Sequence, residues 1–140
     1  MKTIFYSLMV IMLSTSATCK KVRPGDPLNK QLIGMWKYTG KSGGYAGKSE
    51  KADAEIIQVL EFKSGFRYIQ KTNNQVSGQG TYELYKVKSI YSGKEDNAIR
   101  FSSTSAHPNK DSIISLNNDT LVIADNVYDG FKMKYIRFTP

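Results

Sequence analysis

The fold class of this chain is decided by one stretch of its sequence, Leu60-Glu61-Phe62-Lys63-Ser64-Gly65-Phe66-Arg67-Tyr68-Ile69-Gln70. On each side of the turn at residues 63–65, large apolar side chains alternate with polar ones, and this period of two is typical of a half-buried strand. Gly65 supplies the positive φ angle that a short loop between antiparallel strands requires. The stretch therefore predicts a β-hairpin with one buried face.

The same alternation recurs along most of the 140 residues. Strands are predicted at residues 31–39, 55–63, 66–71, 76–86, 97–102, 111–117, 119–125 and 131–139. Most are joined by turns containing Gly, Asn or Asp, and no long stretch has the spacing of an amphipathic helix. The pattern predicts an all-β fold, an eight-stranded antiparallel up-and-down barrel in which every strand edge is paired. An open two-sheet sandwich is the alternative, because it needs the same alternation.

Two connections between the predicted strands are long. Residues 40–54 are rich in Gly, Ser and Lys, and we expect them to form a mobile flap without a packed strand, of the kind that is often functional. Residues 87–96 are expected to form a second excursion from the barrel.

The first 18 residues are expected to be a signal peptide rather than part of the barrel. Lys2 precedes an apolar run at residues 4–13, and small residues follow at 14–18, which is the order of a secretory signal. The run is too short for a membrane-spanning helix, which needs about 20 residues. A buried N-terminal helix is the alternative, and the absence of a polar face on the run argues against it.

Cys19 is the only cysteine of the chain and follows this segment directly. The sequence Ser16-Ala17-Thr18-Cys19 resembles the bacterial lipobox, although the lipobox usually has Leu where this chain has Ser16. The resemblance implies that Cys19 carries a lipid anchor, and Lys20 after it resembles a signal for sorting to the bacterial outer membrane. Cleavage by ordinary signal peptidase near Ala17 is the alternative.

The expected domain organisation has three parts. Residues 1–18 form the signal peptide, residues 19–29 form a lipidated tether, and residues 30–140 form the barrel domain. We expect no regular structure in the tether, because Pro24, Gly25 and Pro27 lie within it.

Composition argues against several function classes. The net charge is +8, but the Lys and Arg residues are scattered, so we expect no nucleic-acid partner and only a weak attraction to anionic lipid head groups. His107 is the only histidine, no Gly-x-Ser-x-Gly motif is present, and no set of His and Cys residues could bind a metal. We therefore expect a protein that is not an enzyme and that uses no metal or cofactor.

Two motifs suggest a family. The first predicted strand contains Leu32-Ile33-Gly34-Met35-Trp36, and the last contains Tyr135-Ile136-Arg137-Phe138. This combination resembles the lipocalins, and more closely the small lipocalin-like lipoproteins of Gram-negative bacteria, although the Thr-Asp-Tyr signature of large lipocalins is absent. The resemblance implies that Trp36 plugs the closed end of the barrel. It also implies that Arg137 stacks on Trp36 as a cation–π contact, which joins the first strand to the last.

The resemblance implies a binding function. An eight-stranded barrel can hold one small apolar ligand, and the flap at residues 40–54 would cover its mouth. The side chains expected to line this site are Tyr38, Phe66, Tyr68, Tyr82, Met133 and Tyr135.

The alternative is a filled barrel that binds another protein of the cell envelope through its loops. Strand alternation sends many large side chains inward, and they would leave little empty volume. The predicted inward residues are Leu32, Trp36, Tyr38, Ile56, Leu60, Phe62, Phe66, Tyr68, Tyr82, Leu84, Ile99, Phe101, Ile114, Leu116, Leu121, Ile123, Phe131, Met133 and Tyr135.

Overall fold

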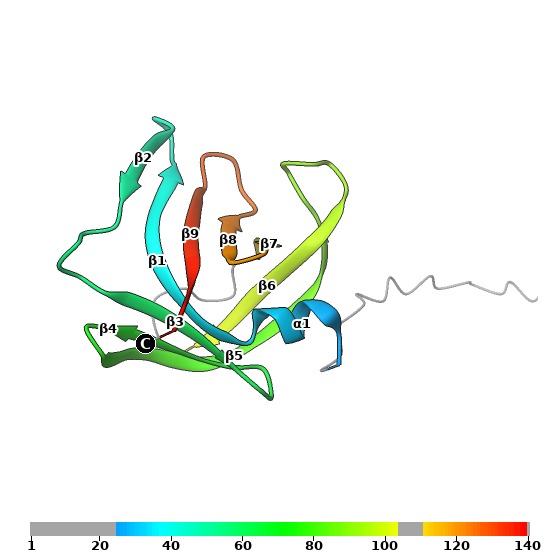
Figure 1. The fold of residues 1–140 in the computed structure, drawn as a ribbon. Coiled ribbons are helices and arrows are strands. Elements are labelled where there is room, and N and C mark those ends of the chain that lie inside the picture. Colours follow the sequence, from blue (N-terminus) through cyan, green and yellow to red (C-terminus); the bar gives the residue numbers. More distant parts are fainter. Residues whose placement is uncertain (1–24, 104–110, 140) are drawn as a thin grey trace, which may run out of the picture.

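Antiparallel strands follow one another around a closed barrel in the computed structural model, which describes residues 25–103 and 111–139 (Figure 1). The eight barrel strands are β1 (Gly34–Gly43), β3 (Gln58–Lys63), β4 (Arg67–Thr72), β5 (Gln75–Lys88), β6 (Glu95–Ser103), β7 (Ser112–Asn117), β8 (Thr120–Asp125) and β9 (Phe131–Phe138). One short helix, α1 (Pro27–Leu32), precedes them. The predicted all-β fold is therefore confirmed. The signal peptide, Cys19 and His107 lie outside the described residues.

The barrel closes through β1, which pairs with β3 on one side and with β9 on the other. Trp36 is opposite Leu60 in β3 and opposite Arg137 in β9. A register shift between Tyr38 and Gly40 marks a bulge in the β1–β9 ladder, as is common where strands bend. Closure excludes the open sandwich, because a sandwich leaves the first and last strands unpaired with each other.

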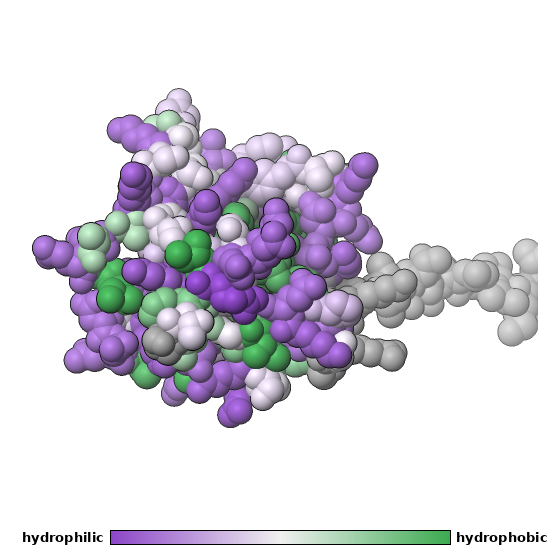
Figure 2. Space-filling model, in the orientation of Figure 1, coloured by the Kyte–Doolittle hydropathy of each residue, from purple (hydrophilic) through white to green (hydrophobic). Residues whose placement is uncertain are grey.

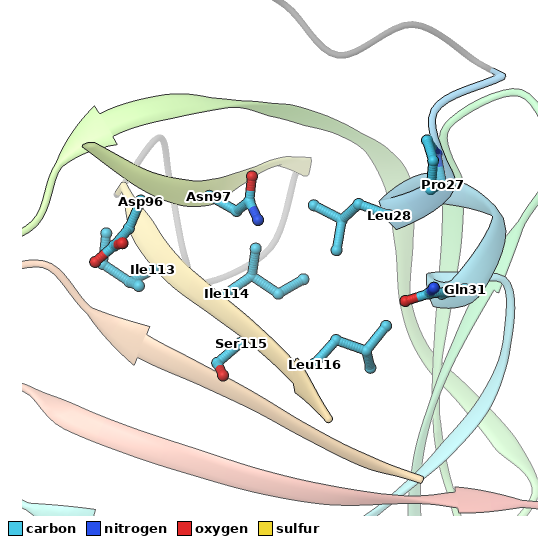
Figure 3. Close-up of a pocket in the computed structure, with 9 residues that line it drawn as sticks. All are labelled: Pro27, Leu28, Gln31, Asp96, Asn97, Ile113, Ile114, Ser115 and Leu116. Atoms are coloured by element: carbon cyan, nitrogen blue, oxygen red, sulfur yellow. The ribbon is translucent and has the colours of Figure 1, made fainter. Parts of the chain in front are cut away.

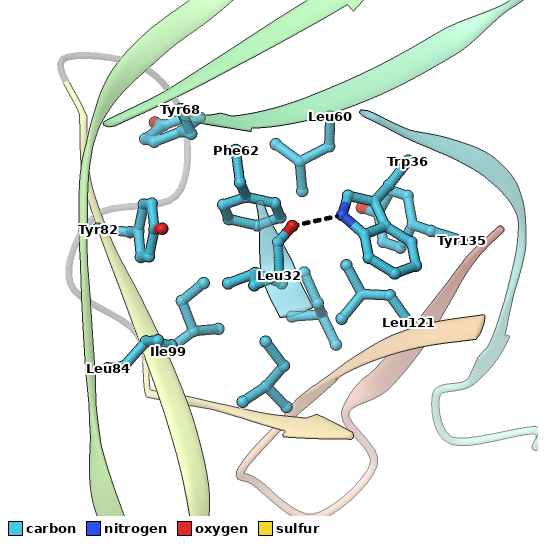
Figure 4. Close-up of a cluster of buried hydrophobic side chains, with 12 residues drawn as sticks. Leu32, Trp36, Leu60, Phe62, Tyr68, Tyr82, Leu84, Ile99, Leu121 and Tyr135 are labelled. Carbon is cyan, nitrogen blue, oxygen red and sulfur yellow. Dashed lines mark hydrogen bonds between the residues drawn. The ribbon is translucent and has the colours of Figure 1, made fainter. Parts of the chain in front are cut away.

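The predicted contact between Trp36 and Arg137 is present. The Arg137 guanidinium lies 4.3 Å from the centroid of the Trp36 ring, which is within the range of a cation–π contact. It also donates hydrogen bonds to the carbonyl oxygens of Gln31 (2.7 Å) and Ile33 (3.3 Å). The Trp36 indole Nε1–H donates to the carbonyl of Leu32 at 2.8 Å (Figure 4). Together these bonds satisfy carbonyls at the end of α1, which a helix leaves without partners of its own.

Gly34 lies two residues before Trp36, and two features of the structure favour glycine at this position. Its φ angle is 130°, a conformation that residues with a side chain rarely adopt. A Cβ atom at this position would lie 2.9 Å from Nη1 of Arg137. The close approach of the guanidinium therefore requires glycine.

The expectation that Pro27 and its neighbours lack regular structure was wrong. Proline is well tolerated in the first turn of a helix, and the Asp26 carboxylate caps α1 by accepting a hydrogen bond from Leu28 N–H at 2.9 Å. Leu32 is fully buried and Asn29 is 3% exposed, so α1 packs against the barrel. Consequently the first strand begins at Gly34 rather than at residue 31.

The expectation that residues 40–54 contain no packed strand was also wrong. β1 continues to Gly43, and β2 (Lys48–Lys51) pairs with its end. Gly44 and Gly47 both have positive φ angles, so this glycine-rich stretch reverses the chain in a hairpin. In the β3–β4 turn, Phe66 also has a positive φ and belongs to the turn rather than to the following strand.

The interior of the barrel is packed with large side chains, as the strand alternation predicts (Figure 4). Every predicted inward residue except Ile56 and Phe131 belongs to the buried cluster or packs against it. Those two are 40% and 41% exposed, respectively. The face of the molecule in Figure 2 is mostly hydrophilic, with small and separate hydrophobic areas. The buried apolar cluster of the described residues lies inside the barrel.

Replacing Arg137 by Lys should destabilise the barrel by about 1–3 kcal/mol, because Lys keeps the charge but loses the planar fork that reaches two carbonyls. Urea denaturation of the two proteins measures the difference. Arg67→Lys is the matched control, because Arg67 is exposed on β4, and we expect it to cost less than about 0.5 kcal/mol. Equal losses in the two variants would contradict the role given to Arg137.

Candidate functional site

The weakest junction in the barrel lies between β6 and β7. These strands pair at only two positions, Ala98 with Ile113 and Ile99 with Ser112. By contrast, β6 pairs with β5 at nine positions, and β7 pairs with β8 at six. The N-terminal part of β6 therefore pairs only with β5, and the C-terminal part of β7 pairs only with β8. The sheet opens between these two parts.

A cleft of about 490 Å³ lies at this opening, and we call it the side cleft (Figure 3). It is lined by Pro27, Leu28 and Gln31 of α1, by Asp96 and Asn97 of β6, and by Ile113, Ile114, Ser115 and Leu116 of β7. Its volume is within the range of small-molecule sites in proteins. The helix thus forms one wall of the cleft, and the two separated strands form the others.

The lining of the side cleft combines an apolar wall with a few polar groups. Leu28, Ile114 and Leu116 supply aliphatic surface, and all three also pack against or belong to the barrel core. Hydrogen-bonding groups come from the Gln31 and Asn97 amides, the Ser115 hydroxyl and the Asp96 carboxylate. Such a mixture suits a ligand that is partly apolar and partly polar.

Within residues 25–103 and 111–139, Asp96 is the only charged residue that lines the side cleft. Its Oδ2 atom accepts a hydrogen bond of 2.7 Å from the Ser92 hydroxyl, which lies in the β5–β6 loop. Among the described residues, no Lys or Arg side chain forms an ion pair with Asp96. The carboxylate therefore keeps some hydrogen-bonding capacity for another partner.

The residues expected to line a ligand site inside the barrel are brought together, but they pack against one another. Tyr38 and Tyr135 meet edge to face, with ring centroids 5.6 Å apart. Tyr68 packs on Phe101 in the same way at 4.8 Å, and Phe66 packs on Tyr82 at 5.5 Å. The Tyr135 hydroxyl points to the sulfur of Met133 at 3.8 Å. None of the six lines the side cleft, and a ligand role for them stays a prediction.

Burial keeps the inner tyrosines neutral. It raises the pKa of Tyr82 to about 12 and raises the pKa of Tyr135 well above its ordinary value. The Tyr82 hydroxyl donates a hydrogen bond of 2.8 Å to Oδ1 of Asn29, a buried amide on α1. By donating this hydrogen bond, Tyr82 holds α1 against the barrel interior.

A second polar cluster lies on the outer face of β5 and β6. The Tyr85 hydroxyl donates to the Asp111 carboxylate, and Arg100 donates to the same oxygen through Nε (3.1 Å) and Nη2 (2.5 Å). Burial alone would raise the pKa of Asp111, but these hydrogen bonds bring it below its ordinary value. These hydrogen bonds connect β5 and β6 to the residue that precedes β7.

Among the described residues, no three His, Cys, Asp or Glu side chains gather into a metal site, and no helix is long and apolar enough to cross a membrane.

The sequence does not predict the side cleft, because residues 27–29 of α1 are expected in the unstructured tether and residues 31–32 in the first strand. One local signal could have revealed the helix: Asp26 followed by Pro27 is a typical pair of N-cap and first helical residue. No local signal marks the point where β6 and β7 stop pairing, since both segments alternate normally. The cleft therefore depends on the tertiary arrangement.

Replacing Tyr82 by Phe should reduce the free energy of unfolding by about 1–2 kcal/mol at neutral pH, because the buried Asn29 amide loses a donor. The pH dependence should also change. In the wild type, the unfolded state loses the Tyr82 proton near pH 10 and the folded state only near pH 12, so stability falls as the pH rises through this window. The fall should be smaller in Tyr82→Phe.

Urea denaturation at pH 7, 10 and 11.5 would measure both effects. Tyr45→Phe is the control, because Tyr45 is 97% exposed in the β1–β2 turn, and its profile should match the wild type. If Tyr82→Phe also matched the wild type at every pH, Tyr82 would not hold α1 in the way described.

Comparison with protein-family models, with curated proteins and with solved structures found no significant match to this chain. The resemblance to small lipocalin-like lipoproteins therefore stays a prediction from the motifs around Trp36 and Arg137, with which the closed eight-stranded barrel is compatible.

Proposed function

We propose that this chain is a lipoprotein anchored in the bacterial outer membrane and that it binds a small ligand in the side cleft. The observation that carries the binding proposal is a cleft of about 490 Å³ beside an interior that large side chains occupy. An eight-stranded barrel has room for either a packed interior or one small ligand. Since the interior is packed, the ligand is assigned to the side cleft instead of to the predicted site near Tyr38 and Tyr135.

Binding rather than catalysis fits the lining of the side cleft. General acid–base chemistry is most often carried by a histidine, and nucleophilic catalysis by a hydroxyl group needs an activating base beside it. Among the described residues that line the cleft, Asp96 is the only one with a carboxylate, and none has an imidazole, thiol or amine. Ser115 lies in the lining without a histidine beside it in that set. We therefore infer a carrier or receptor instead of an enzyme.

The proposed anchor would keep the side cleft near the membrane surface. Cys19 precedes Gly25 by six residues, and a chain of that length spans at most about 20 Å. Pro27 and Leu28, which line the cleft, follow directly. A ligand that partitions into the bilayer would therefore meet the cleft close to the point of anchoring.

A second candidate is the interaction module, and one feature of the loops favours it. Tyr45 in the β1–β2 turn and Tyr128 in the β8–β9 loop are 97% and 85% exposed. The two loops are joined, because Gly44 N–H donates to the carbonyl of Gly130 at 3.2 Å. Exposed tyrosines on adjacent loops are frequent in protein interfaces.

Replacing Cys19 by Ser should abolish lipid attachment. Metabolic labelling with a tagged fatty acid should mark the wild type and leave the variant unmarked, and the variant should leave the membrane fraction or remain unprocessed. Ser16→Ala keeps the cysteine and serves as the control, with labelling expected to persist. Normal maturation and full membrane partition of Cys19→Ser would refute the anchor.

Filling the side cleft should remove a ligand that co-purifies with the protein. Ser115 is exposed and lines the cleft, so the indole of Ser115→Trp should occupy part of it without entering the core. Mass spectrometry of small molecules extracted from the purified proteins should show at least about a tenfold lower yield from this variant, the effect of losing about 1.4 kcal/mol of binding free energy.

Val76→Trp is the matched control, because Val76 is 58% exposed on β5 and does not line the side cleft. It should retain the ligand. Equal yields from both tryptophan variants would place binding elsewhere. Recovery of a polypeptide in place of a small molecule, lost on Tyr45→Ser and Tyr128→Ser, would favour the interaction module.

A further inference from the structure

We propose that the side cleft selects amphiphiles with a protonated amine and rejects those with a carboxylate. This inference rests on the proposed function and specifies the chemical class of the ligand. It is carried by the single uncompensated charge in the lining and by the position of that charge relative to the aliphatic wall.

The first argument is electrostatic. The chain as a whole has a net charge of +8, yet the one charged residue of the side cleft is the acid Asp96. The nearest lysines along the neighbouring segments, Lys30 of α1 and Lys94 before β6, do not line the cleft. A cation entering the cleft would therefore meet a carboxylate without an ion-pair partner among the described residues, whereas an anion would meet repulsion.

The second argument concerns hydrogen bonds. A primary ammonium group has three N–H donors and no acceptor. The Asp96 carboxylate uses Oδ2 for the Ser92 hydroxyl, and its remaining lone pairs are available. Asn97, the next residue of β6, points to the opposite face of the strand, and the second acceptor on the side of Asp96 is the Ser115 hydroxyl oxygen. These acceptors match an ammonium group better than they match a carboxylate, which has no proton to donate at neutral pH.

The third argument is the layout of the lining. In Figure 3, Asp96 lies at one end of the side cleft, and Leu28 and Leu116 lie toward the other, next to α1. Ile114 lies between them on β7. The Asp96 carboxylate points away from these aliphatic side chains, so a ligand with its amine at Asp96 would pass its chain through the opening between β6 and β7 to reach them, where burial of each methylene adds to binding.

Other ligand classes fit these observations less well. A fully apolar ligand would take water away from the Asp96 carboxylate without offering it a hydrogen bond or an opposite charge, which is costly. A sugar would place its hydroxyls against Leu28, Ile114 and Leu116, which offer them no side-chain hydrogen bonds. A metal ion needs several ligands, and one carboxylate does not supply them.

The experiment compares three probes that share one aliphatic chain: octylamine, octanol and octanoate. Isothermal titration of the full chain at pH 7 measures the affinity for each. Octylamine should bind roughly tenfold more tightly than octanol, as expected for a charged hydrogen bond, and octanoate should bind more weakly than octanol. Any contribution of the N-terminal apolar segment is common to all variants, so differences between variants report on the cleft.

Asp96→Asn tests the origin of the preference. It should lower the affinity for octylamine to about that for octanol. Asp129→Asn is the matched control, because Asp129 is an exposed acid in the β8–β9 loop that does not line the side cleft. This control should keep the preference for the amine.

The outcomes separate the inference from the proposed function. If octanoate binds as tightly as octylamine, or if Asp96→Asn keeps the preference, the inferred ligand class is wrong although the side cleft binds ligands. If none of the three probes binds, or if Ser115→Trp binds all three like the wild type, the side cleft is not a binding site and the proposed function is wrong as well.

Discussion

The stacking of Arg137 on Trp36 is the interaction on which the rest of the structure depends. A single guanidinium covers the indole ring of the first strand and donates to two carbonyls at the end of α1, while the indole donates to a third. The contacts of Arg137 and Trp36 therefore close the barrel and fix the position of α1 at the same time, as one constraint. The same constraint explains Gly34, because a side chain there would collide with the guanidinium. A change at any of these groups should disturb both closure and the helix.

The side cleft follows from the way α1 is fixed. Arg137 and Trp36 hold the C-terminal end of the helix, and the Tyr82 hydroxyl holds Asn29 in its middle. The helix thereby lies against the opening between β6 and β7, where strand edges would otherwise be exposed to other chains. A helix that covers a strand edge prevents other chains from pairing with it, and α1 covers the edges of β6 and β7 only in part. The space that remains is the side cleft, with walls set by packed elements on each side.

Strand alternation predicted the barrel well because burial on one face of a strand imposes a period of two on the sequence itself. The exceptions have local causes. Ile56 precedes β3, and Phe131 is the first residue of β9, so neither lies deep within a strand. A helix of six residues such as α1 is too short to show a helical period, and Pro27 was interpreted as a breaker although it begins the helix. The side cleft depends on where β6 and β7 stop pairing, and tertiary packing alone determines that point.

A packed interior changes where the specificity of such a barrel can reside. Substitutions at Tyr38, Tyr68 or Tyr135 alter aromatic packing in the core, so their first effect is on stability. Asp96 and Ser115 lie outside the buried cluster, so they can vary with little effect on the fold. The closed barrel thus fixes the backbone, and the recognition chemistry is left to a few side chains at the one junction where the sheet opens. Under the proposed function, ligand preference and stability are therefore set by separate residues and can change independently.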